Sequence, residues 1–348
     1  MKKILLTLFT AIIILPLTAQ TIGEVDLKDI NNYGLKKLKD GPKKVFIGQF
    51  RLNFQTMYIA SEKKKGGFRG GSDYTRSYKS DVEASLAIGL KGLKEQDLID
   101  ITNQLYQDLV AKLKAEGYEI IPASEAGKIE ELNDWEKRTG GQLSQSQYEG
   151  YVSVSPTGFD YLVRGVKDDG KEKGNILNRS AGVSKQLEGA ALMIVNITIP
   201  FAQEAESGGS KLLGRLGGGA KVVAETGLMI GNNALDVSGT TQYYANGSSV
   251  ISIYAKQSMS NINVGNWVLK KPIIIDDVIE KKKFKAEETA KVDWGTDAGF
   301  FKVYDVDDRF MSKVQSLTVN PEKYKSGVLG AASKYLNAVW QEIVVNLK

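Results

Sequence analysis

The sequence predicts an α+β fold, with a mixed sheet, flanking helices and a long amphipathic β-hairpin insertion. The first observation is the stretch "DVEASLAIGLK" (Asp81–Lys91), in which apolar and polar residues alternate as they do in a half-buried strand. The second is an apolar stripe at helical spacing in Glu95–Gly117. The third is the order of the predicted elements, strand, helix, strand, several strands and a final helix, which favours helices packed on a mixed sheet.

Residues 1–19 have the pattern of a secretory signal peptide. Lys2 and Lys3 precede the apolar run "ILLTLFTAIIILPL", and the small residue Ala19 precedes Gln20 at a plausible cleavage point. The run is too short for a membrane-spanning helix. We therefore expect an exported chain that is periplasmic or associated with the outer membrane.

The predicted hairpin lies within residues 48–91 of a single α+β domain (43–348), which follows a polar N-terminal arm (20–42) containing one short helix. Val45–Phe54 begins as an apolar run and then alternates, with Gln49, Arg51, Asn53 and Gln55 on the polar face. Ser61–Asp73 is rich in Gly and Lys and is predicted to be a loop, which would join this strand to Asp81–Lys91.

The remaining elements follow from periodicity and from turn residues. In Glu95–Gly117 the apolar stripe predicts a helix that ends at Gly117. A final amphipathic helix is predicted for Gly327–Leu347, with Leu336, Val339 and Ile343 on one face. Further strands are predicted within the ranges 118–121, 159–170, 189–209 and 221–257, the last containing an Asn246-Gly247 turn signal.

Composition excludes much of the usual catalytic chemistry. The chain contains no histidine and no cysteine, so triads with either residue, disulfides and His- or Cys-ligated metals are excluded. Carboxylate chemistry, Ser–Lys chemistry and oxygen-ligated cations remain. The formal net charge is +5, and the loss of Lys2 and Lys3 with the leader leaves +3, so nucleic acid is not expected as a partner. We predict no enzyme activity and no cofactor.

Four local patterns have some features of a site, and each favours an ordinary structural role. Gly208–Lys221 is rich in glycine but lacks the Lys-Ser/Thr of a phosphate loop, so no nucleotide is expected. Asp305–Arg309 lacks the later Gly and Glu of a calcium loop. Asp160 has no second carboxylate at catalytic spacing, and the stretches Ser61–Lys65 and Ser77–Ser80, which put serine near lysine, fall in predicted loops. No catalytic, cofactor-binding or metal-binding residue is assigned.

The apolar face of the predicted hairpin can contact the protein's own core, a partner protein or lipid. A core contact is the ordinary arrangement of an antiparallel sheet. In the lipid alternative, hairpins from several subunits would form an oligomeric pore, with Arg51, Asn53 and Glu83 facing its lumen. For the partner alternative the predicted binding residues are Phe50, Leu52, Phe54, Val82, Leu86, Ile88 and Leu90.

Four segments in this order resemble the periplasmic α/β domain of the curli-secretion channel (CsgG-like) group and its soluble relatives, such as the TolB amino-terminal domain. They are "KVFIGQF", the helix beginning "DLIDITNQL", "FDYLVRGVK" and "ALMIVNITI". The resemblance implies a non-enzymatic role in envelope assembly or secretion, and some members form ring-shaped pores. The channel members are lipoproteins, whereas this chain has no cysteine to acylate.

The sequence therefore predicts an exported, non-enzymatic component of an outer-membrane secretion or assembly machine that binds outer-membrane or periplasmic proteins, with a homo-oligomer as one option. Three alternatives stay open: an oligomeric outer-membrane pore, a secreted carboxylate-based hydrolase, and a carbohydrate-binding adhesin that uses residues such as those of "TQYYANGSS" (241–249).

Overall fold

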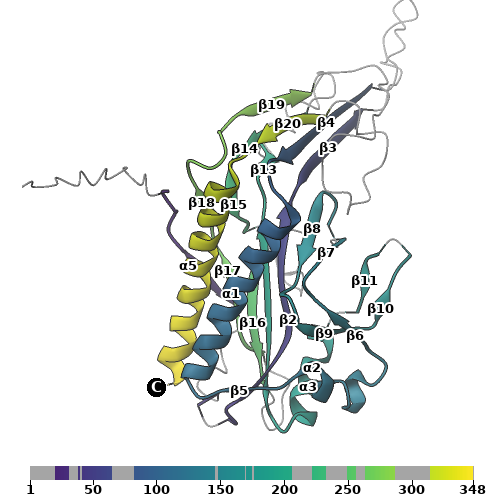
Figure 1. Cartoon of the computed structure of the whole chain (residues 1–348), viewed down its shortest axis with the longest axis vertical. Coiled ribbons are helices and arrows are strands. Elements are labelled where there is room, and N and C mark those ends of the chain that lie inside the picture. The colour runs from purple at the N-terminus through teal and green to yellow at the C-terminus, as the bar shows by residue number, and fades with distance from the viewer. Residues whose placement is uncertain are drawn as a thin grey trace, which may run out of the picture.

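A mixed β-sheet organises the computed structural model, and helices cover both of its faces (Figure 1). The structure describes residues 20–30, 38–39, 41–64, 82–145, 148–168, 170–174, 176–205, 222–232, 249–255, 263–286 and 314–347. The α+β class and the mixed sheet with flanking helices are confirmed. In spatial order the strands of the sheet are β1 (Leu27–Ile30), β17 (Asn263–Leu269), β16 (Val250–Tyr254), β12 (Ala191–Ile199), β2 (Lys44–Gln55), β8 (Tyr151–Val154) and β7 (Leu143–Gln145), and β5 (Glu119–Ile120) pairs with the start of β2.

The central pair is β2 and β12, which run parallel and contain a β-bulge at Gly48. Ile47 pairs with Met193 and Gln49 pairs with Ile194, so Gly48 is an extra residue in β2. A Cβ atom on Gly48 would lie 2.7 Å from Leu192 Cδ1, which accounts for the glycine at the bulge. The bulge changes which residues of β2 face each side of the sheet, and the predicted change from an apolar run to an alternation reflects it.

Helix α1 (Glu95–Ala115) confirms the predicted apolar stripe. Its buried residues include Leu98, Ile101, Leu105, Leu109 and Leu113. At its start the backbone N–H of Lys94 donates to Asp97 Oδ2 (2.7 Å), and at its end Gly117 has a φ of +82°, the left-handed conformation that commonly terminates helices.

Helix α5 (Pro321–Leu347) lies beside α1 on the same face of the sheet (Figure 1). It begins earlier than predicted, at Pro321, because proline is well suited to the first turn of a helix. Leu336, Val339 and Ile343 are buried as predicted. Tyr335 is also buried, and its hydroxyl donates to the carbonyl of Trp267 in β17 (2.7 Å), which fixes the helix to the sheet.

The opposite face of the sheet has a second, smaller core that includes Phe46, Leu192 and Ile194. Short helices cover it: α2 (Ala123–Ala126), η2 (Glu130–Leu132), η3 (Ile176–Arg179) and α3 (Ser180–Gln186). Two short strand pairs follow the same part of the chain: β6 (Glu136–Thr139) with β9 (Asp160–Val163), and β10 (Gly165–Val166) with β11 (Glu172–Lys173).

Shorter sheets extend the molecule at the end where β2 finishes (Figure 1). One has the order β20 (Val314–Thr318), β4 (Val82–Lys91), β3 (Met57–Lys64), and a second has the order β13 (Ala202–Glu204), β14 (Val222–Thr226), β19 (Lys283–Ala286). Strands β14 and β19 contact β4, so these two sheets pack together. A further pair joins β15 (Leu228–Ile230) to β18 (Ile273–Ile275) beside α5.

The predicted hairpin insertion between Val45–Phe54 and Asp81–Lys91 is not confirmed. β4 pairs antiparallel with β3, from Met57 opposite Gly89 to Lys64 opposite Val82. Both edges of β2 are already taken by β12 and β8, and the chain turns at Thr56, where the amides of Thr56 and Met57 donate to the carbonyl of Gly150 (2.9 and 3.0 Å). Asp81 and most of the predicted Gly- and Lys-rich loop lie outside the described residues.

The N-terminal arm contains a strand, β1, in its described part, where one short helix was predicted. Residues before β1 dock along α5 and β18: Gln20 Nε2 donates to the carbonyl of Lys323 (2.8 Å), and the amide of Gly23 donates to the carbonyl of Ile274 (2.9 Å). Gly330 leaves room for Ile22, because a Cβ atom there would lie 2.4 Å from Ile22 Cδ1.

We predict that Gly330→Leu loosens the docked arm, because a larger side chain on α5 displaces Ile22. Amide exchange of Gly23 and Lys270 should increase, and the free energy of unfolding should fall by about 1–3 kcal/mol, the usual cost of overpacking. Asn337→Leu places the same side chain at an exposed position of α5 and is the control. Equal amide exchange in the two variants would contradict the prediction.

Candidate functional site

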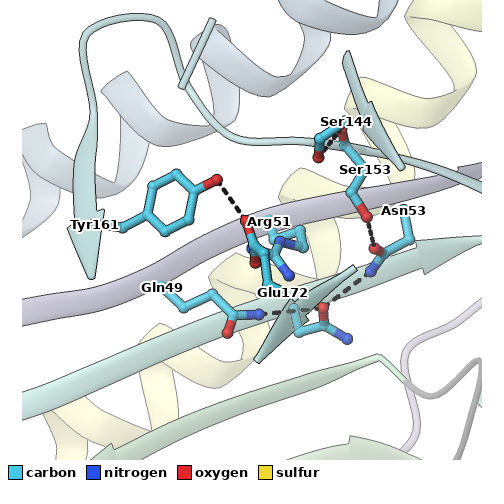
Figure 2. A network of polar contacts seen from close by, with 8 residues as sticks. Gln49, Arg51, Asn53, Ser144, Ser153, Tyr161 and Glu172 are labelled. Carbon is cyan, nitrogen blue, oxygen red and sulfur yellow. Dashed lines mark hydrogen bonds and ion pairs between the residues drawn. The ribbon is translucent and has the colours of Figure 1, made fainter. Parts of the chain in front are cut away.

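A buried row of polar side chains lies on the face of the sheet opposite α1 and α5. After the bulge, Gln49, Arg51, Asn53 and Gln55 of β2 point to this face, and Asn53 is only 1% exposed. Burial of polar groups is costly unless they are hydrogen-bonded, so their partners decide what the row can do. Figure 2 shows the network, which we define as Gln49, Arg51, Asn53, Ser144, Ser153, Tyr161, Glu172 and Asn196.

Amide and hydroxyl groups connect four neighbouring strands of the sheet. Asn53 Nδ2 in β2 donates to Asn196 Oδ1 in β12 (2.9 Å), and Gln49 Nε2 contacts the same oxygen at 3.5 Å. On the other side Ser153 Oγ in β8 donates to Asn53 Oδ1 (2.6 Å), and Ser144 Oγ in β7 donates to the carbonyl of Ser153 (3.2 Å) (Figure 2). These hydrogen bonds fix the register of the strands.

A buried ion pair between Arg51 and Glu172 is the charged part of the network. Arg51 Nη2 donates to Glu172 Oε2, Tyr161 OH donates to Glu172 Oε1 (2.7 Å), and the Arg51 guanidinium lies 5.7 Å from the centre of the Tyr161 ring (Figure 2). The two charged side chains are 10% and 11% exposed. Burial lowers the pKa of Arg51, but the charge and hydrogen bond of Glu172, together with Tyr161 and Tyr148, more than offset this, so that the pKa lies above its ordinary value.

Asp160, which the sequence offered as an isolated carboxylate, is a structural anchor at the start of β9. Thr139 Oγ1 donates to Asp160 Oδ1 (2.5 Å) and Lys137 Nζ lies 2.9 Å from Asp160 Oδ2, so the side chain joins β9 to β6. These hydrogen bonds lower the pKa of Asp160. A general acid needs the opposite shift.

The side chains predicted to bind a partner lie in the protein's own core. The structure buries six of them, each at most 3% exposed: Phe50, Leu52, Phe54, Leu86, Ile88 and Leu90. The side chain of Val82 is outside the described part. Arg51 and Asn53, placed in a pore lumen by the lipid alternative, are instead buried and hydrogen-bonded, because the polar face of β2 is covered.

The other predicted patterns are placed only in part. Asp276 and Asp277, a pair of acidic residues in the sequence, follow β18, and Asp276 pairs with Lys281 (2.7 Å). Gly208–Lys221, Asp305–Arg309, Ser77–Ser80 and most of 241–249 are outside the described residues. Within the part of the chain that the structure describes, no group of three or more acidic residues could hold a metal ion, and no helix is long and apolar enough to cross a membrane.

Sequence reasoning identified one half of the network and missed the other. The polar face of β2 was predicted from its alternation. Asn196 offered a signal, since it interrupts the apolar run "ALMIVNITI", but Glu172 lies in a charged tract, "DDGKEKG", where nothing distinguishes a buried carboxylate from an exposed one.

Comparison with known proteins gives no relative for this chain: no family model matches it, and neither does a curated protein or a solved structure. The CsgG-like resemblance therefore stays a prediction.

We predict that Glu172→Gln destabilises the fold by about 3 kcal/mol, because the buried charge of Arg51 loses its counter-ion. The matched control is Glu188→Gln, which removes the same charge from a pair with Lys44 in which Glu188 is 81% exposed, and should leave stability nearly unchanged because water screens the pair. Urea unfolding measures both. Unchanged stability of Glu172→Gln would show that the pair does not hold the network together.

Stability should also fall at alkaline pH. Burial, with a further contribution from Glu172, raises the pKa of Tyr161 from 10.0 to about 12. The unfolded chain then ionises first, so stability present below pH 10 is lost as the pH rises towards 12. Tyr161→Phe should show a smaller loss over this interval in urea unfolding, and an identical loss would contradict the assignment.

Proposed function

We propose that this chain is an exported, non-enzymatic component of an outer-membrane secretion or assembly machine, and that it acts by binding other proteins. The leader pattern of residues 1–19 supports export. The absence of histidine and cysteine removes the commonest catalytic side chains, which supports binding over catalysis.

The open edge of β3 carries the proposal. Among the described strands β3 pairs only with β4, at the end of the molecule where the shorter sheets gather (Figure 1). The amide of Leu90 donates to the carbonyl of Thr56 (2.9 Å), whereas the amide of Met57 points the other way, to Gly150. Ile59 and Ser61 follow Met57 at two-residue spacing, so their backbone groups face away from β4.

An edge of this kind suits recognition by strand addition. An extended segment of a partner would hydrogen-bond to the outward backbone groups of Ile59 and Ser61 and continue the sheet. Ile59 is half-buried and Ser61 is exposed, so the edge is reachable at its middle. The docking surface is then a backbone edge, because the apolar side chains of this sheet are used in the core.

We predict that Ile59→Pro abolishes partner binding and leaves the fold intact, since proline removes an outward N–H group without breaking the β3–β4 ladder. Ile59→Ala removes the same side chain but keeps the N–H group, and should still bind. The measurement is a quantitative pull-down from native outer membranes followed by mass spectrometry. Capture of the same proteins by Ile59→Pro would contradict strand addition at this edge.

Fractionation checks the location. We expect the protein with the outer-membrane fraction, through its partners, although the sequence has no cysteine for a lipid anchor. Recovery wholly in the soluble periplasmic fraction as a monomer would contradict this location, and would also contradict the oligomeric pore that the sequence left open.

A further inference from the structure

Arg51 has a hydrogen-bonding capacity that its present partner does not use. The contact with Glu172 is made by Nη2, while Nε, on the same edge of the guanidinium, is buried and has no hydrogen-bond partner among the described residues. A carboxylate that binds arginine side-on takes both of these N–H groups. Glu172 therefore makes only one of the two hydrogen bonds that a carboxylate bound side-on to Arg51 would make.

Glu172 belongs to a small strand pair that is separate from the main sheet. In the described part of the chain β10 and β11 pair only with each other, and Figure 1 shows them projecting from the body of the molecule. Their turn is held internally, by the amide of Lys167 on the carbonyl of Lys171 (2.8 Å). The side chain of Glu172 joins this pair to Arg51 in the main sheet and to Tyr161 in β9.

Glycines stand at both stems of the pair. Gly165 has a φ of +142° and Gly174 a φ of +86°, which are values that other residues adopt only with strain. A Cβ atom on Gly174 would lie 2.7 Å from Arg164 Cβ, so the two stems approach each other closely. Two glycines at these positions allow the pair to move as a unit about its base.

We propose that Arg51 is a carboxylate-binding site which Glu172 occupies from within the chain, and that a carboxylate of an acidic segment in a protein partner replaces Glu172 when β10–β11 swings away. A carboxylate fits better than a phosphate, because the single positive charge of Arg51 balances one negative charge and Tyr161 adds a neutral donor. The identity of the ligand as part of a protein rests on the proposed function, whereas the carboxylate site does not.

Sodium acetate tests the site without any partner. Glu172→Ala removes the resident carboxylate, and acetate should raise its melting temperature by about 2–4 °C relative to sodium chloride at equal ionic strength. The wild-type chain, in which Glu172 fills the site, and the double variant Arg51→Met Glu172→Ala should not respond. An equal response of the double variant, or no response of Glu172→Ala, would overturn the site.

NMR of the wild-type chain tests the replacement and does not depend on a variant that folds. A short acetylated peptide rich in glutamate, added in excess, should shift the signals of the Arg51 and Tyr161 side chains and of the Glu172 and Lys173 amides, while amide exchange within β10–β11 stays unchanged because the pair keeps its internal hydrogen bonds. Unchanged signals at saturating peptide would overturn the replacement of Glu172. Loss of this effect together with intact binding at the β3 edge would refute the inference alone and leave the proposed function standing.

Discussion

The parallel pairing of β2 with β12, with its bulge at Gly48, is the constraint on which the rest of the structure depends. Before the bulge both faces of β2 are apolar, and Phe46 enters the smaller core while Ile47 enters the larger one. After it, Phe50, Leu52 and Phe54 point to α1 and α5. Side chains of a strand alternate between its two faces. The extra residue at the bulge therefore places the polar residues of β2 together on the face opposite α1 and α5.

That polar row has physical consequences of its own. Once Asn53 and Arg51 are taken out of water, they need partners, and Asn196, Ser153 and Glu172 provide them from three other strands. Networks of this kind favour one register and one arrangement of strands. The Arg51–Glu172 pair contributes less to net stability than its attraction suggests, since desolvation of both charges offsets most of it. A pair of this kind therefore serves specificity, or function, more than it serves stability.

The sequence predicted the elements well and their partners poorly. The stripes of α1 and α5 repeat over several turns, and an apolar repeat of that length and spacing is typical of a helix packed on a core. The alternation of Asp81–Lys91 also predicted a strand, but a period of two residues does not identify the neighbouring strand. The pairing of β4 with β3 follows from a turn at Thr56. This turn depends on the carbonyl of Gly150, which lies 94 residues away in the chain. Glu172 was missed for the same reason, because its burial comes from Arg51 and Tyr161, which lie in other strands.

The apolar face that the sequence offered for docking illustrates how a core limits function. Ile88 and Leu90 are at most 2% exposed, so a partner could reach them only by opening the molecule. Two capacities remain in the described chain, the backbone groups of Ile59 and Ser61 and the unpaired Nε of Arg51. They differ in what binding requires. The edge of β3 is reachable without rearrangement, whereas Arg51 accepts a ligand only after β10–β11 releases Glu172, so that affinity there is reduced by the free energy of opening. A partner that engages the edge first would offset part of this cost, because its acidic segment would then be held near Arg51 at a high effective concentration.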